Sequence, residues 1–255
     1  MKLDYDHGFR LRIDHADRAE IRLQWRGRGI VFDPCEPIEP DDIVVITGPS
    51  PDRIRGLAAA VKAGTRPTVV ASDEVCDWLT KLGPFDGGPG PRTIDGVRFE
   101  SLHYDPPAEA RPLPRRLVAY VGALKPGAAL RHLREKSDMP SGPPHIWQVT
   151  FPDHGRLLHL DLALHRGTSA DWVDRAATAF GNPDWLVLGF QYGEGEGLRK
   201  WVSRFGGKVL LTDIVNGDRR ARGLPVELVT PLRDQLVAAG IETHVFATQA
   251  SYRFE

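Results

Sequence analysis

The chain has 255 residues, of which 41% are hydrophobic and 26% are charged, and its formal net charge is −1. This balance is ordinary for a globular protein and excludes the strong global field that nucleic-acid or anionic-membrane partners attract. No apolar run approaches the about 20 residues that a membrane span needs, and the charged, alternating start of the sequence does not resemble a signal peptide. We therefore expect a cytoplasmic protein without a nucleic-acid or membrane partner.

The two cysteines, Cys35 and Cys76, are too few for a disulfide framework or a cysteine-based zinc site. Free cysteine is one of the most frequently buried residue types. We therefore expect both thiols to be reduced and packed in the interior, as is usual in the cytosol.

Strands and helices alternate along most of the sequence. Apolar alternation and short β-branched runs predict strands, and a hairpin turns at Asp95-Gly96. The hairpin is predicted over 93–102, and the other predicted strands are 9–13, 19–25, 30–32, 43–46, 68–71, 117–121, 146–150, 156–160, 185–188, 208–211 and 243–246. The predicted helices are 52–62, 72–82, 128–136, 169–180, 196–205 and 231–239. The glycine- and proline-rich segment 84–91 is predicted to be a loop.

This order of elements indicates a layered α/β sandwich rather than an all-β fold. No linker divides the sequence, so we expect a single domain over residues 1–255. Residues 109–144 form an irregular insert in which arginine and lysine are frequent. Two interpretations of that insert stay open: a solvated basic face, or a rim that attracts an anionic ligand.

The stretch 43–57 is the centre of the predicted fold. A buried strand at 43–46 ends in Thr47-Gly48-Pro49-Ser50-Pro51, a run that extends neither a strand nor a helix. Pro51 suits the first turn of a helix, and Ser50 is a natural N-cap before it. Ser50, Asp52 and Arg53 are therefore expected at the carboxyl end of a strand, where α/β proteins build their sites.

The same stretch resembles the metal-binding loop of metallo-β-lactamase fold hydrolases. In that family this strand runs into a T-H-x-H-x-D-H loop that holds two metal ions, and Thr47 and Asp52 match the pattern. Gly48, Ser50 and Arg53 stand where the family has histidines. The chain therefore resembles a member of the family with a degenerate metal-binding motif. The resemblance implies an α/β (α+β) protein with a four-layer αββα sandwich.

Three later positions extend the resemblance. His103 follows a strand and resembles the family's third histidine, and Asp161 ends a strand at the position of the bridging aspartate. Asp213 stands where the last histidine ligand would be. The second half is most similar to the branch that includes L-ascorbate-6-phosphate lactonase.

The resemblance leaves few metal ligands, which would be Asp52, His103, Asp161 and Asp213. A carboxylate-rich set suits a hard cation better than zinc, which needs at least three protein ligands. Three clustered carboxylates without a cation would repel one another, whereas an arginine is always charged and pairs with carboxylates bidentately. We therefore expect no cofactor, with zinc or manganese as the alternative. The hypothesis is that the Arg53 guanidinium occupies the vacated metal position and bridges two or more of Asp52, Asp161 and Asp213.

Two functions remain open from the sequence. The first is a non-catalytic protein that acts as a scaffold, ligand sensor or partner-binding module, with a small molecule or protein as partner and possible homo-oligomers. The second is a hydrolase of a phosphorylated lactone or another ester, in which Asp52, Asp161 and Asp213 bind metal or act as general base. A weaker variant of the second uses Ser50 as nucleophile with His103 and Asp161.

Overall fold

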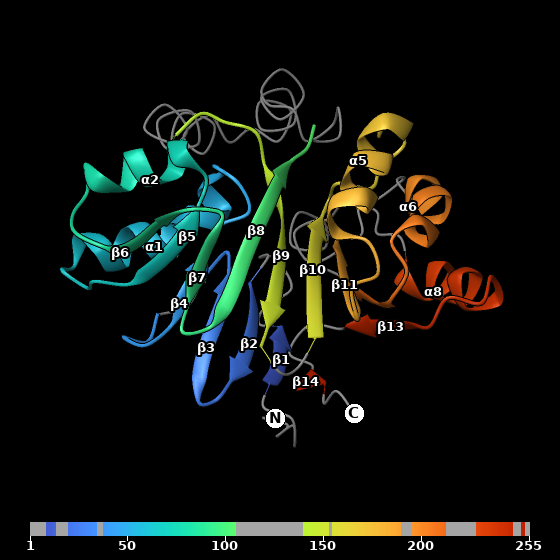
Figure 1. Cartoon of the computed structure of the whole chain (residues 1–255), viewed down its shortest axis with the longest axis horizontal. Coiled ribbons are helices and arrows are strands. Elements are labelled where there is room, and N and C mark those ends of the chain that lie inside the picture. Colours follow the sequence, from blue (N-terminus) through green and yellow to red (C-terminus); the bar gives the residue numbers. More distant parts are fainter. Residues whose placement is uncertain are drawn as a thin grey trace, which may run out of the picture.

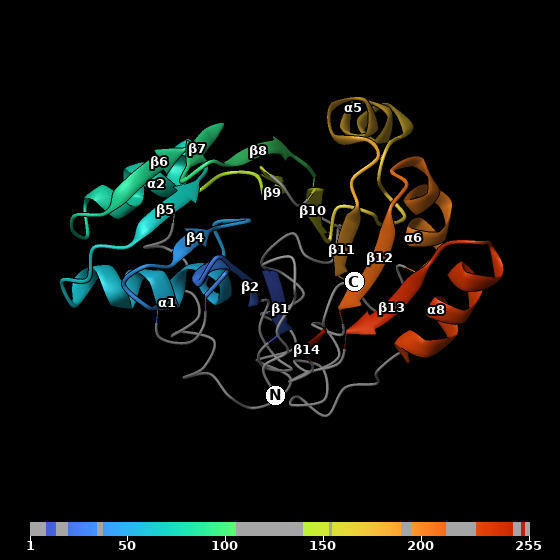
Figure 2. The same cartoon turned by 60° about the horizontal axis from the view of Figure 1, so that its bottom comes forward.

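The computed structural model describes residues 9–13, 20–34, 38–105, 140–152, 155–189, 195–212, 228–246 and 251–252. Within these residues the chain forms two seven-stranded sheets that face each other, with helices on the outer face of each (Figures 1 and 2).

The first sheet is built by the N-terminal half of the chain and one C-terminal strand, in the order β14-β1-β2-β3-β4-β5-β6. Its strands are β1 (Phe9–Ile13), β2 (Ile21–Trp25), β3 (Arg28–Phe32), β4 (Ile43–Val45), β5 (Thr68–Ala71), β6 (Asp86–Pro89) and β14 (Ser251–Tyr252). The pairs from β14 to β3 are antiparallel, and those from β3 to β6 are parallel. Parallel pairing needs crossover connections, which helices provide between β4 and β5 and between β5 and β6.

The second sheet has the order β13-β12-β11-β10-β9-β8-β7. Its strands are β7 (Arg92–Ile94), β8 (Val97–His103), β9 (His145–Phe151), β10 (Gly155–Asp161), β11 (Trp185–Gly189), β12 (Lys208–Thr212) and β13 (Thr243–Phe246). Strands β7 to β10 pair antiparallel, and β10 to β13 pair parallel. The predicted hairpin is confirmed, because Asp95 and Gly96 both have positive φ between β7 and β8.

Helices cover both outer faces, so the architecture has four layers, αββα. The first sheet is covered by α1 (Pro51–Lys62) and α2 (Asp73–Thr80). The second is covered by α5 (Ala170–Phe180), α6 (Gly195–Trp201) with the 3₁₀ turn η1 (Val202–Arg204), and α8 (Val229–Ala238). Three apolar cores correspond to the three layer boundaries, and the one between the sheets is centred on Phe32, Phe99 and Trp147.

One predicted loop is wrong. Residues 86–89 of the expected loop 84–91 form β6, which pairs parallel with β5 at the edge of the first sheet. The sequence Asp-Gly-Gly-Pro contains no β-former, so its pairing is imposed by its neighbour. Gly87 has φ +100°, and a Cβ there would lie 2.1 Å from the Val69 carbonyl oxygen. Strand β14 was not predicted either, and the elements expected at 117–121 and 128–136 lie outside the described residues.

Cys76 is a buried free thiol on α2, as predicted, and burial raises its pKa to about 11. Cys35 lies outside the described residues. Among the helices that the structure describes, none is both long and apolar enough to cross a membrane.

Candidate functional site

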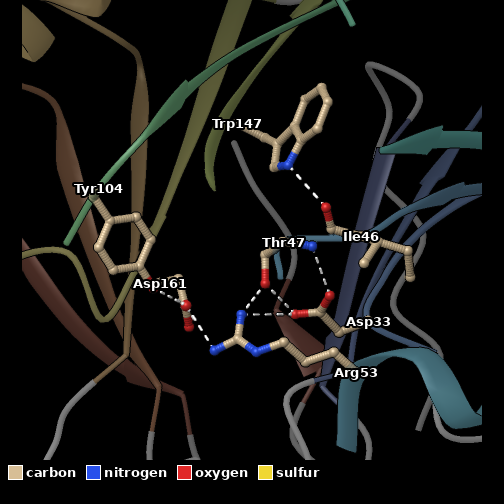
Figure 3. Close-up of polar contacts among 7 residues, drawn as sticks. All are labelled: Asp33, Ile46, Thr47, Arg53, Tyr104, Trp147 and Asp161. Atoms are coloured by element: carbon tan, nitrogen blue, oxygen red, sulfur yellow. Dashed lines mark hydrogen bonds and ion pairs between the residues drawn. The ribbon is translucent and has the colours of Figure 1, made fainter. Parts of the chain in front are cut away.

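Polar side chains from both sheets meet between the carboxyl ends of β3, β4, β8 and β10 (Figure 3). Asp33 directly follows β3 and Asp161 ends β10, and both have left-handed backbones with φ of 47° and 48°. This conformation is uncommon for residues other than glycine and turns each chain sharply at the end of its strand. Each carboxylate is thereby presented to the space between the two sheets.

Arg53, in the first turn of α1, lies between these two carboxylates. Its Nη1 is 3.2 Å from Asp33 Oδ2, and its Nη2 is 2.6 Å from Asp161 Oδ2. Its Nη1 also donates to the hydroxyl of Thr47. The Arg53 side chain is 13% exposed, and those of Asp33 and Asp161 are 0% and 3% exposed. One guanidinium therefore pairs with an aspartate from each sheet in a nearly water-free place.

Both aspartates accept further hydrogen bonds, and the one to Asp161 reaches the same Oδ2 that pairs with Arg53. Asp33 accepts hydrogen bonds from the Thr47 backbone N–H at 2.8 Å and from the Thr47 hydroxyl at 2.6 Å. Asp161 accepts one from the buried Tyr104 hydroxyl. We call the set Asp33, Thr47, Arg53, Tyr104 and Asp161 the Arg53 clasp.

The charges of the clasp are set by burial and by its own ion pairs. Burial alone would raise the pKa of Asp161, but the charge and hydrogen bond of Arg53 hold it below the ordinary value. Burial raises the pKa of Asp33 to about 7, although Arg53 and Thr47 act in the opposite direction. The two aspartates keep the pKa of Arg53 well above its ordinary value, and burial beside Asp161 does the same for Tyr104. At neutral pH Arg53 and Asp161 are charged, Tyr104 is neutral, and Asp33 is the member that titrates.

Backbone contacts fix the loop after β4 against the second sheet. The His145 N–H donates to the Thr47 carbonyl at 2.6 Å, and the Trp147 indole donates to the Ile46 carbonyl at 3.1 Å. Tyr104 N–H in turn donates to the Pro144 carbonyl at 2.9 Å. The first two bonds join residues about a hundred positions apart and hold Thr47 where its side chain contacts Asp33 and Arg53.

The position that the resemblance assigns to the family's first histidine is tightly packed. Gly48 is buried, and a Cβ on it would lie 3.2 Å from Pro144 Cβ and 3.7 Å from Arg53 Cδ. The position of the second, Ser50, is the N-cap residue of α1, as predicted, but its hydroxyl makes no capping bond. Its carbonyl accepts from the backbone N–H of Arg53 and Ile54.

The other predicted site residues that the structure describes do not join the clasp. Asp52 lies in α1, but its side chain is outside the described part of the chain, as is Asp213. His103 is exposed at the end of β8, and its ring contacts His145. The structure records no hydrogen bond that joins Ser50, His103 and Asp161, so no Ser–His–Asp relay is assembled.

The sequence predicted that Arg53 and Asp161 lie together, but it did not predict Asp33 or Tyr104 as members of this site. The signal for Asp33 was present, because it follows an apolar strand as Asp161 does. The signal for Tyr104 was its position directly after His103, at the end of the same strand.

The described residues do not fit the two-metal centre that the resemblance implies. The resemblance assigns glycine, serine and a charged guanidinium to the positions of three histidine ligands, and Asp161 is engaged by Arg53 and Tyr104. Among the described residues no three His, Cys, Asp or Glu side chains are arranged to hold a metal ion.

Comparison with known proteins gives similarity in structure only. No family model matches the chain, and no curated protein matches it. A metallo hydrolase from Ignicoccus hospitalis, Igni18, superposes with a TM-score of 0.61 at 14% identity over 96% of this chain and 100% of the other. An isothiocyanate hydrolase from Delia radicum gut bacteria gives 0.59 at 16% identity, over 96% and 99%. A putative metal-dependent hydrolase from Parabacteroides distasonis gives 0.57 at 15% identity, over 98% of each chain.

The chain has the metallo-β-lactamase fold. The match over nearly the whole length agrees with the two facing sheets and the helices outside them. At these identities the likeness concerns the fold, and the chemistry has to be argued from the residues of this chain.

Proposed function

We propose that this chain is a metallo-β-lactamase fold protein that has lost its metal-binding histidines and works without catalysis, as a scaffold, ligand sensor or partner-binding protein. In this proposal the Arg53 guanidinium takes the place of the metal ions. The lactonase-like branch remains the most similar one in sequence layout.

The observation that carries the proposal is the double ion pair of Arg53 with Asp33 and Asp161. A metal ion between the ends of β3 and β10 would neutralise carboxylates from both sheets. The guanidinium neutralises the same kind of charge with directed N–H donors, and it stays protonated at any working pH. It also leaves no open coordination position at which water could be activated.

The packing over Gly48 supports the same proposal independently. With Pro144 against this position, a ligand side chain there would require the residues before β9 to move. The absence of a ligand side chain at position 48 and the close packing of Pro144 against it thus support the same proposal.

The alternative is a hydrolase with a rebuilt carboxylate-rich site. Such an enzyme would need Asp161 available to a cation or a water molecule. Its contacts with Arg53 and Tyr104 favour the non-catalytic function instead.

The test is whether the purified chain binds a metal ion in a way that depends on Asp161. The chain is purified without chelators or a histidine tag, gel-filtered and analysed by mass spectrometry, and Mn²⁺ is added in a melting experiment. We expect less than about a tenth of an equivalent of metal that disappears in Asp161→Asn, and no Mn²⁺-induced rise in melting temperature, because only an ion that binds the native state stabilises it. Stoichiometric metal that disappears in Asp161→Asn would overturn the proposal and direct attention to hydrolase assays.

A further inference from the structure

A pair of histidines lies outside the Arg53 clasp, where β8 and β9 begin to separate. His103 and His145 are directly opposite each other in the antiparallel register of these strands. Directly opposed residues project from the same face of the sheet. Their ring centroids are 6.4 Å apart in an edge-to-face arrangement.

The ring nitrogens of this pair are available. Nδ1 of His145 is 3.2 Å from Ser101 Oγ. Among the described residues no hydrogen bond reaches Nε2 of His145 or either ring nitrogen of His103. When Nδ1–H donates to Ser101, the lone pair of His145 lies on Nε2, which is the arrangement by which a hydrogen bond on one imidazole nitrogen prepares the other for a metal.

The surroundings favour a cation. Glu74 and Asp73, in the first turn of α2, both interact electrostatically with His145. Among the described residues, the charged and titratable groups that interact with this ring are two carboxylates and one other imidazole.

We propose that His103 and His145 form a two-imidazole site for a divalent transition-metal ion, of the class of Cu²⁺ or Ni²⁺, with Ser101 as a positioning residue. Imidazole ligands suit these ions, and Cu²⁺ binds most tightly among them. Metal–nitrogen distances of about 2 Å in a tetrahedral site place two ring centroids roughly 5 Å apart. The pair therefore closes by about 1 Å through side-chain rotation, which the exposed His103 permits. Water fills the other coordination positions.

This site is separate from the clasp. Its ligands are two imidazoles on neighbouring strands, and among the described residues neither ring contacts Arg53 or Asp161. The backbone N–H of His145 donates to the Thr47 carbonyl, so the two sites are neighbours that share no side chain. A metal at this site and a metal-free clasp are compatible.

The test is a Cu²⁺ titration of the untagged chain, followed by electron paramagnetic resonance. We expect one ion per chain with superhyperfine splitting from two nitrogens, and loss of this signal in His103→Asn and in His145→Asn. Ser101→Ala should weaken binding about tenfold, as removal of a hydrogen bond to a metal ligand does. His244→Asn is the matched control, because it removes another exposed imidazole and should leave the site intact.

Absence of saturable binding, or binding that survives in His103→Asn, would overturn the inference and leave the proposed function untouched. His103 is exposed, so its replacement should not disturb folding, and circular dichroism checks this. Binding that is lost in Asp161→Asn but kept in both histidine variants would overturn the inference and the metal-free clasp together.

Discussion

Removal of the Arg53 guanidinium is the most direct test of the clasp. Arg53→Met keeps much of the apolar stem and deletes the charge between Asp33 and Asp161. Asp33 keeps its two hydrogen bonds from Thr47, whereas Asp161 keeps only the one from Tyr104. Breaking a buried ion pair by removing one partner costs about 3–5 kcal/mol, because the other charge stays buried without compensation. We expect the free energy of unfolding to fall by about this amount.

The matched control is Arg98→Met. Arg98 pairs with Glu100 at 2.6 Å, but its side chain is 60% exposed. An exposed pair of this kind contributes at most about 1 kcal/mol, so the control should be nearly silent. Both variants are measured by urea denaturation with circular dichroism and tryptophan fluorescence, and coincident transitions justify a single free energy.

The loss of unfolding free energy in Arg53→Met, here called the deficit, should also depend on pH. This dependence gives a second and sharper test. In the unaltered chain the pKa of Asp161 is below its ordinary value of 3.8, so this group stabilises the fold above that pH and the contribution is lost as pH falls. Without Arg53, burial raises the pKa of Asp161 above the unfolded value. Protonation then relieves the buried charge, and the deficit should shrink between pH 7 and pH 4. A deficit no larger than that of Arg98→Met, or one that does not change with pH, would refute the reasoning.

The remaining predictions concern three other positions. His159 is buried, and burial lowers its pKa from 6.5 to about 4, so the unfolded chain binds more protons in that window and stability falls as pH falls. This contribution is roughly 3 kcal/mol. Asp33, whose pKa is raised to about 7, acts in the opposite direction over the same pH range, so the expected result is a difference between chains. In urea denaturation at several pH values, stability should fall less, or rise more, on acidification in His159→Leu than in the unaltered chain. Gly48→His should lower the melting temperature without metal uptake, because Pro144 closes the position; stoichiometric metal in this variant would contradict the packing argument. Gly87→Ala should destabilise by more than about 2 kcal/mol, whereas Gly64→Ala, at φ +85° with nothing within 4 Å of the added Cβ, should cost about 1 kcal/mol. Equal melting temperatures for the two alanine variants would show that the contact at Gly87 is not the cause.

The layered fold could be predicted because its signals are local. Strands 9–13, 68–71 and 243–246 have the predicted bounds, since apolar alternation and β-branched runs are strong local signals for strands. Pro51 opens α1 as expected because proline fits the first helical turn. Segment 86–89 could not be found in this way, because its strand character comes from the free edge of β5 and not from its own residues.

The partners of Arg53 could be predicted only in part. A charged residue at the start of a helix after a strand was expected near Asp161, and these two side chains do meet. Asp33 was missed because which strand ends face each other depends on how two sheets pack. No spacing in the sequence encodes the distance between Asp33 and Arg53. The closure over Gly48 was invisible for the same reason, since Pro144 is far from it along the chain.

The positive charge of Arg53 is covalently attached to α1, whereas a metal ion has to bind from solution. A metal ion between two carboxylates is present only as often as its free concentration allows, so stability then varies with the composition of the surroundings. A tethered cation has a fixed effective concentration set by the geometry of its own chain. The charge balance between Asp33 and Asp161 therefore does not follow metal availability, and chelators should leave it unaffected.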